Sequence, residues 1–389
     1  MTPISKLPDV GTTIFTIMSQ LATDHQAINL GQGFPNFNTD ERLIEAVNAA
    51  MKAGHNQYPP MAGIVPLREN IAAKVKSLYG HTYDPVNEVT VTSGASEALF
   101  VSILALVHPG DEVIVIEPFY DLYIPAITLA GGTPVIVPMQ APDDTGQRYR
   151  VDWDRVASAV TSRTRMLILN FPHNPTCINL LESDLDALED IVARSGITLL
   201  SDEVYEHIVF DDDIHRSLCR RPALAERAVI VSSFGKTFHM TGWKIGYCTA
   251  PVALMTEIRK VHQFNVFTVN TPMQYALAAF MTDPQHYRNL PKFYQEKRDY
   301  LYRGLQKTRL KPLPSESTFF LMASYEAISD MDEFTFSQWL TTEKGVAVIP
   351  VSAFYAQPDA PESNHQLVRF CFAKDNATLG RAIQLLADL

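Results

Sequence analysis

Two lysines lie eight residues apart in the stretch from Ala228 to Tyr247, which reads A-V-I-V-S-S-F-G-K-T-F-H-M-T-G-W-K-I-G-Y. Its apolar residues 229–231 predict a buried strand, and residues 245–248 can begin another. Burial between strands would lower the pKa of Lys236 or Lys244, because desolvation disfavours the charged amine. A neutral amine is a nucleophile for a carbonyl carbon. A surface loop with two solvated lysines is an equal alternative for this stretch taken alone, since lysines are mostly exposed.

A carboxylate and an amide follow two other predicted strands. The run G-I-T-L-L-S-D-E-V-Y at 196–205 delivers Asp202 at the carboxyl end of an apolar strand. Ligands of open α/β sheets bind outside the carboxyl ends of the strands, so Asp202 is a candidate site residue, with a helix N-cap as its alternative role. Asn174 lies in N-F-P-H-N-P-T after another strand, where Asn-Pro also indicates a plain turn.

Two further segments could bind anions. Residues 93–96, Ser-Gly-Ala-Ser, lie between a predicted strand and a predicted helix, and free backbone amides at a helix N-terminus bind phosphate. Arg369 lies inside the apolar run Q-L-V-R-F-C-F and therefore needs an anionic partner. The carboxylate of a ligand held by the guanidinium fork would supply one. A structural salt bridge to Asp or Glu is the alternative.

The stretch S-S-F-G-K-T-F-H-M-T-G-W-K-I-G-Y resembles the pyridoxal-phosphate attachment segment of the class I and II aminotransferases. The resemblance extends over nearly the whole chain and is strongest to the bacterial methionine aminotransferases and the kynurenine and glutamine transaminases. It implies pyridoxal 5'-phosphate as cofactor, with Lys236 forming the Schiff base and then acting as general base. It also implies that Asp202 keeps the pyridine nitrogen protonated, and that Tyr205 and Asn174 hydrogen-bond the phenolic oxygen.

The resemblance assigns the other predicted site residues as well. Tyr120 would stack on the cofactor ring, and the phosphate would lie against Ala95, Ser96, Ser233 and Lys244. Lys244 occupies a position that is arginine in many aminotransferases, and Cys177 replaces the glycine of the family's usual N-P-T-G. Arg369 would bind the substrate α-carboxylate in a pocket formed with Gly33, Asn174 and Phe15. Tyr58 and Phe267 resemble residues that cross a dimer interface, toward the neighbour's phosphate and substrate pocket respectively.

This resemblance predicts a homodimeric transaminase that works by a ping-pong mechanism through pyridoxamine phosphate, with an amino acid and a 2-oxo acid as substrates. The pocket is rich in aromatic residues and has no obvious second arginine, which favours methionine, glutamine or aromatic donors over aspartate. A C–S lyase of the same fold and a kynurenine-preferring aminotransferase are the alternatives. A non-catalytic effector-binding module would need an attached DNA-binding domain, and no basic helix-turn-helix segment precedes residue 30.

The elements that must position these residues alternate between strand and helix. Strands are expected at 89–92, 113–116, 134–137, 166–170 and 197–201, with helices at 41–54, 96–107, 119–130, 152–160 and 182–194. This alternation predicts a largely parallel sheet covered on both faces. Helices at 251–264, 271–282, 285–306, 332–343 and 376–388, with short strands at 318–323, 346–349 and 367–372, predict a second, α+β unit.

The predicted fold is therefore α/β, of the fold-type-I class, with a mostly parallel seven-stranded sheet between helices and a smaller α+β domain. We divide the chain into an N-terminal segment at 1–40, a large cofactor-binding domain at 41–283 and a small domain at 284–389. The N-terminal segment is expected to pack with the small domain.

Composition excludes several classes of function. The 389 residues are 46% apolar and carry a net charge of −11, which argues against nucleic acid or an anionic membrane as partner. Four well-separated cysteines predict buried thiols and neither a zinc site nor a disulfide framework: Cys177, Cys219, Cys248 and Cys371. No apolar segment in residues 1–21 could act as a signal peptide or membrane span, so we expect a soluble cytoplasmic protein without a metal.

Overall fold

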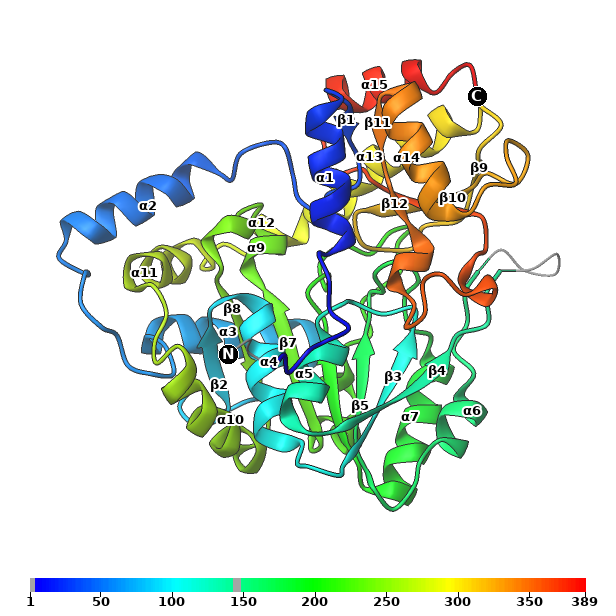
Figure 1. Ribbon diagram of the computed structural model, residues 1–389. Coiled ribbons are helices and arrows are strands. Elements are labelled where there is room, and N and C mark those ends of the chain that lie inside the picture. Colours follow the sequence, from blue (N-terminus) through cyan, green and yellow to red (C-terminus); the bar gives the residue numbers. More distant parts are fainter. Residues whose placement is uncertain (1–3, 143–147) are drawn as a thin grey trace.

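The computed structural model describes residues 4–142 and 148–389 and is built around a seven-stranded sheet (Figure 1). Its strands lie in the order β2-β8-β7-β6-β5-β3-β4. Their bounds are β2 Val89–Thr92, β3 Glu112–Glu117, β4 Thr133–Pro138, β5 Thr164–Asn170, β6 Thr198–Asp202, β7 Ala228–Ser233 and β8 Gly246–Thr249. Neighbouring strands are parallel except β8, which runs antiparallel to β2 and β7. The prediction of a mostly parallel seven-stranded sheet is confirmed.

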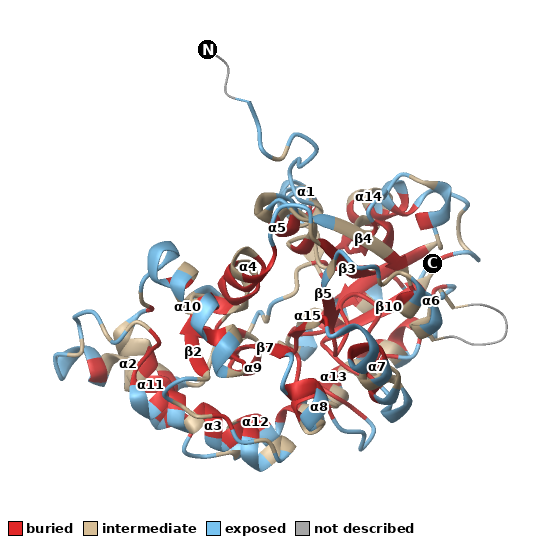
Figure 2. Cartoon of the chain, turned by 90° about the horizontal axis from the view of Figure 1, so that it is seen from below, coloured by how far each residue is buried: buried red, intermediate tan, exposed pale blue. Residues whose placement is uncertain are grey.

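Alternate strand residues bury the two faces of this sheet in separate cores, as the two-residue period of a strand requires. In β3, Val113 and Val115 belong to one core and Ile114 and Ile116 to the other. Helices α4 (Gly94–Leu106), α5 (Tyr123–Ala130) and α10 (Val252–Asn265) cover the first face. Helices α3 (Val65–Tyr79), α7 (Glu182–Ser195) and α8 (Pro222–Ala225) cover the second. Figure 2 shows the buried strands in red between helices whose outer faces are exposed.

Strand register brings polar residues to one edge of the sheet. Asn170 at the end of β5 lies beside Asp202 at the end of β6. Ser233 at the end of β7 lies beside Gly246, and Gly246 also pairs with Thr92 at the end of β2. The carboxyl ends of β2, β5, β6 and β7 therefore meet the start of β8 at a single edge, where ligands of open α/β sheets bind.

A four-stranded antiparallel sheet in the order β12-β13-β10-β9 forms the core of the C-terminal part. Its strands are β9 Lys311–Pro312, β10 Phe320–Ser324, β12 Ile349–Pro350 and β13 Leu367–Cys371. Helices α13 (Leu290–Leu305), α14 (Glu333–Lys344) and α15 (Asn376–Leu385) accompany it. The N-terminal helix α1 (Ile14–Asp24) packs against α14, and β1 (Ile28–Asn29) pairs with β11 (Val346–Ala347), so the chain's first elements lie beside its last (Figure 1).

The remaining helices are α2 (Glu41–Lys52), which packs on α11 (Thr271–Phe280), and the short α6 (Trp153–Ser158), α9 (Phe234–Thr237) and α12 (Gln285–Arg288). Among the described residues, no helix combines the length and apolar character that crossing a membrane requires.

Three expected elements differ from the structure. The single helix expected at 285–306 is two helices, α12 and α13, which meet at Asn289; Pro291, in the first turn of α13, has no amide to continue a helical ladder. The helix expected from 119 begins only at Tyr123, and the Phe119 amide donates instead to the Phe354 carbonyl of the C-terminal part. The strand expected at 346–349 is two short strands, β11 and β12, which belong to different sheets.

Candidate active site

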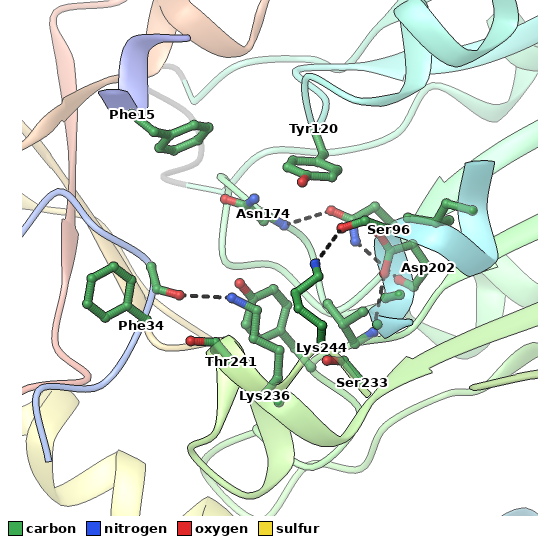
Figure 3. A pocket seen from close by; sticks show the side chains of 18 of the residues that line it. Phe15, Phe34, Ser96, Tyr120, Asn174, Asp202, Ser233, Lys236, Thr241 and Lys244 are labelled. Carbon is green, nitrogen blue, oxygen red and sulfur yellow. Dashed lines mark hydrogen bonds between the residues drawn. The ribbon is translucent and has the colours of Figure 1, made fainter. Parts of the chain in front are cut away.

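Most of the predicted site residues line one cavity of about 310 Å³ at the polar edge of the large sheet. These are Phe15, Gly33, Ala95, Ser96, Tyr120, Asn174, Asp202, Tyr205, Ser233, Lys236, Lys244 and Arg369. Figure 3 shows Lys236 and Lys244 extending into the cavity from one side, with Tyr120 and Phe15 on the other. Residues from the large sheet, the C-terminal sheet and the N-terminal segment thus meet in one place.

Lys236 lies on the one-turn helix α9, directly after β7. Its Nζ donates to the Gly33 carbonyl oxygen at 2.8 Å and lies 5.1 Å from the centre of the Phe319 ring. Burial lowers the pKa of this amine to about 8. A lysine with such a pKa has a much larger neutral, nucleophilic fraction near neutral pH than an ordinary lysine.

Asp202 ends β6 and is buried at the base of the cavity. Its Oδ2 accepts a hydrogen bond from the Tyr123 hydroxyl at 2.8 Å, and its Oδ1 faces the Val204 amide at 3.4 Å. Burial raises the pKa of this carboxyl to about 6, while the amine of Lys236 partly opposes the shift. A cationic group bound beside Asp202 would keep the carboxylate ionised. The carboxylate would in turn stabilise the protonated form of that group.

The first turn of α4 and the residues just before β8 bring together groups that could bind an anion. The Ser93 side chain makes no capping hydrogen bond, so the first amides of α4 remain available to a ligand. Lys244 Nζ lies 3.3 Å from Ser96 Oγ and adds a positive charge. A Cβ on Gly246 would lie 2.8 Å from the Ala95 nitrogen, so only glycine lets β8 pack this closely on the turn. These groups fit a phosphate.

Arg369 lies in the middle of β13 and is only 1% exposed. Its guanidinium stacks on the Phe320 ring at 3.8 Å, donates to the Gly31 carbonyl at 3.2 Å and donates to Asn174 Oδ1. Burial lowers its pKa to about 10, and its Nε has no hydrogen-bond partner in the described part of the chain. No Asp or Glu within residues 4–142 and 148–389 forms an ion pair with it, so the described residues provide no structural salt bridge for this guanidinium. A buried cation without an anion fits a carboxylate ligand.

Two predicted site residues lie outside this cavity. Tyr58 is 83% exposed and Phe267 is 44% exposed, and their rings pack edge to face at 5.5 Å. The structure therefore does not bring them to the site of their own chain.

Sequence reasoning missed Tyr123 and Phe320, which contact Asp202 and Arg369 respectively. Tyr123 comes three residues after Tyr120, a helical spacing that could have indicated a shared location. Phe320 has no such signal, because it is one of many apolar residues in a C-terminal strand. The four cysteines are buried and free, as predicted. Cys177 has a positive φ of 63°, a conformation that favours glycine.

Comparison with known proteins gives a consistent result. The family described as aminotransferase class I and II matches residues 25–386. A methionine aminotransferase of Escherichia coli is 50% identical over 388 residues, covering 100% of this chain and 98% of that protein. A probable N-succinyldiaminopimelate aminotransferase of Mycobacterium tuberculosis is 40% identical, covering 99% of this chain and 98% of that protein. Kynurenine–oxoglutarate transaminase 1 of Homo sapiens is 35% identical, covering 92% of each. A solved structure of an Escherichia coli methionine aminotransferase superposes with a TM-score of 0.96 over 100% of both chains, at 50% identity.

Proposed function

The chain belongs to the class I and II aminotransferases, and on this premise we propose that it transfers the amino group of an L-amino acid with an uncharged side chain to a 2-oxo acid. Methionine, glutamine and aromatic amino acids are the proposed donors. The transaminase activity itself, the ping-pong mechanism and the cofactor pyridoxal 5'-phosphate follow from membership of the family. When bound, the cofactor would supply an electron-withdrawing ring and a carbonyl group that can accept the amino group.

We propose that Lys236 is the residue that holds the cofactor covalently. Its partly buried amine, with a pKa lowered to about 8, supports this role. When the amine is free, it can take the proton from the substrate Cα and return it, because its pKa lies near the operating pH. The Gly33 carbonyl accepts one N–H of this amine at 2.8 Å, which fixes its orientation.

The remaining pocket residues would hold the parts of the cofactor. Asp202 would keep the proton on the ring nitrogen, and the buried position of the carboxylate supports this. Tyr205 and Asn174 would face the phenolic oxygen, and Tyr120 would stack on the ring. The phosphate would lie against Ala95, Ser96, Ser233 and Lys244, where helix amides and a lysine leave room for an anion.

The proposed substrate class rests on the positive charges of the cavity. Among the described residues, the cations that line it are Lys236, Lys244 and Arg369. Lys236 would hold the cofactor, Lys244 its phosphate and Arg369 the α-carboxylate. The described lining residues then leave no further cation for a carboxylate on the substrate side chain, whereas Phe15 and Phe320 offer apolar contacts. This count of charges is the observation that supports donors with uncharged side chains.

We further propose a homodimer in which Tyr58 reaches the neighbour's cofactor phosphate and Phe267 lines the neighbour's pocket. The exposure of both side chains supports this proposal. We also propose domains at residues 41–283 and 284–389, with residues 1–40 packed on the second. The contacts of α1 with α14 and of β1 with β11 support the last assignment.

A matrix of amino donors and 2-oxo acid acceptors tests the substrate proposal. Methionine, glutamine, phenylalanine, kynurenine, aspartate and a cysteine S-conjugate should be compared by kcat/KM with several 2-oxo acids. We expect methionine, glutamine and phenylalanine to exceed aspartate by at least about tenfold. A preference for aspartate would contradict the proposal. Release of ammonia and pyruvate from the conjugate, faster than formation of its oxo acid, would indicate a C–S lyase.

A further inference from the structure

A buried glutamate and histidine lie directly behind the proposed phosphate site. Glu97 is in the first turn of α4, on the side away from the cavity, and its Oε2 accepts the Ser93 amide at 2.5 Å. Its Oε1 lies 2.5 Å from Nδ1 of His262, which is on α10 and has no exposed surface. His262 Nε2 lies 3.1 Å from the Met61 carbonyl oxygen. The pair thus joins the backbone at the start of α4 to α10 and to the segment that follows Tyr58.

The contacts of Glu97 and His262 fix which of their atoms donate and which accept hydrogen bonds. A carbonyl oxygen can only accept, so His262 Nε2 must carry a proton that it donates to Met61. Glu97 Oε2 must be an acceptor, because the Ser93 amide can only donate. One further proton lies between Glu97 Oε1 and His262 Nδ1. Every polar atom of the two side chains therefore has a partner, and the imidazole is held at both nitrogens.

The Ser93 amide matters because of its place in the chain. Ser93 connects β2 to α4, and the next three residues line the cavity at the proposed phosphate site. The Ser93 side chain does not cap the helix, so among the described residues it is Glu97 that ties this residue back to α4. Holding the N-cap residue in place fixes the direction of the amides that follow it.

We propose that Glu97 and His262 are positioning residues for the cofactor phosphate. They contact neither cofactor nor substrate but set the direction of the α4 amides at residues 94–96. This inference rests on the proposed location of the phosphate at Ala95 and Ser96. It predicts that disturbing the pair weakens binding of the phosphate more than binding of the pyridoxal ring.

Two substitutions of His262 separate its two hydrogen bonds. The amide of His262→Asn replaces Nδ1 and can still donate to Glu97, but it is too short to reach Met61. The amide of His262→Gln replaces Nε2 and can still donate to Met61, but it no longer contacts Glu97.

The measurement is the dissociation constant of pyridoxal divided by that of pyridoxal phosphate, each taken from the absorbance of the lysine adduct. We expect His262→Gln to lower this ratio about ten- to hundredfold, as for other groups that orient a ligating residue. His262→Asn should stay within about twofold of the wild type.

Substitutions of Glu97 give an independent comparison. The amide of Glu97→Gln can accept from Ser93 and donate to an unprotonated Nδ1, so the whole set of hydrogen bonds survives and the ratio should be kept. Glu97→Met has a similar size and makes none of them, so its ratio should fall as in His262→Gln. His215→Gln is the matched control, because His215 is a buried histidine 2.7 Å from buried Glu203 and lies outside the cavity lining. This control should leave the ratio unchanged.

The outcomes are distinct. Equal ratios in His262→Asn and His262→Gln, or equal ratios in Glu97→Gln and Glu97→Met, would overturn the positioning role. A wild-type protein that binds pyridoxal as tightly as pyridoxal phosphate would instead contradict the proposed phosphate site itself.

Discussion

The two ends of the cavity are built in different ways. The proposed phosphate end uses backbone amides of α4 and residues from turns at one edge of a single sheet, with Ser96, Ser233 and Lys244 close to the strands that place them. The end around Arg369 is assembled from three distant parts of the chain, because Phe15 and Gly31 come from the N-terminal segment, Asn174 from the loop after β5 and Phe320 from β10.

The electrostatics of the two ends differ as well. At the phosphate end, the positive potential comes from the N-terminus of a helix and one lysine. Burying this end costs little desolvation energy, because uncharged backbone amides supply much of the potential. At the other end, a complete guanidinium is buried without an ion-pair partner among the described residues, and burial lowers its pKa to about 10. A substrate carboxylate would supply the missing anion. We therefore expect the phosphate end to determine cofactor affinity and the Arg369 end to determine which substrates react.

The largest expected effect lies between the two ends, at Asp202. Replacing it in Asp202→Ala removes the carboxylate that would keep the ring nitrogen protonated, and kcat should fall roughly a hundred- to a thousandfold. Cofactor affinity should change far less, because the phosphate end is intact. Measuring kcat together with the cofactor dissociation constant checks this. Turnover within a few-fold of the wild type would show that Asp202 has no electrostatic role.

Arg369→Lys should have the next largest effect. Lysine keeps the charge but cannot form two parallel hydrogen bonds to a carboxylate. The loss should lie toward the lower end of the range for a buried charged pair, ~2–3 kcal/mol, or about thirty- to two-hundredfold in kcat/KM. It should be similar for methionine, glutamine and phenylalanine, because all three present the same carboxylate. A loss confined to one donor would show that Arg369 contacts the side chain instead.

The contrast between the ends also explains what the sequence could predict. Strands such as β6 and β7, with polar residues at their carboxyl ends, are local patterns, so Asp202 and the turn after β7 could be located from the residues themselves. The surroundings of Arg369 could not, since nothing in the sequence indicates that Phe320 stacks on it or that Gly31 accepts its hydrogen bond. Those contacts depend on how two sheets and an N-terminal segment pack. The break at Asn289 was missed for a different reason: Pro291 is a local signal for a helix start, but the predicted helix at 285–306 was extended across it.

Lys244→Gln tests the phosphate end and should have a smaller effect. The substitution removes a charge beside Ser96 but leaves the helix amides, so affinity for pyridoxal phosphate should fall about tenfold. Affinity for pyridoxal, which has no phosphate, should stay the same. At saturating cofactor, the ranking of amino donors should also stay as in the wild type. A changed ranking would mean that the two ends are not separate in function.

Phe267→Ala is the smallest and most specific test of the Arg369 end. Phe267 is half exposed in its own chain and would contact substrate only in a neighbour's pocket, so its effect depends on the proposed dimer. Removing a partly buried aromatic contact should change the ratio of kcat/KM for phenylalanine to that for methionine by about two- to tenfold. This change is smaller than the one expected when a fully fitted apolar contact is lost. The carboxylate remains bound by Arg369, so both donors should still react.

Phe264→Ala is the control, because Phe264 is 86% exposed, lies three residues away and has no proposed contact with substrate. If both variants change the ratio equally, the effect comes from the surface in general and Phe267 does not line the partner's pocket. If neither changes it, selectivity lies wholly within one chain, and the apolar contacts of Phe15 and Phe320 must account for the preference among donors.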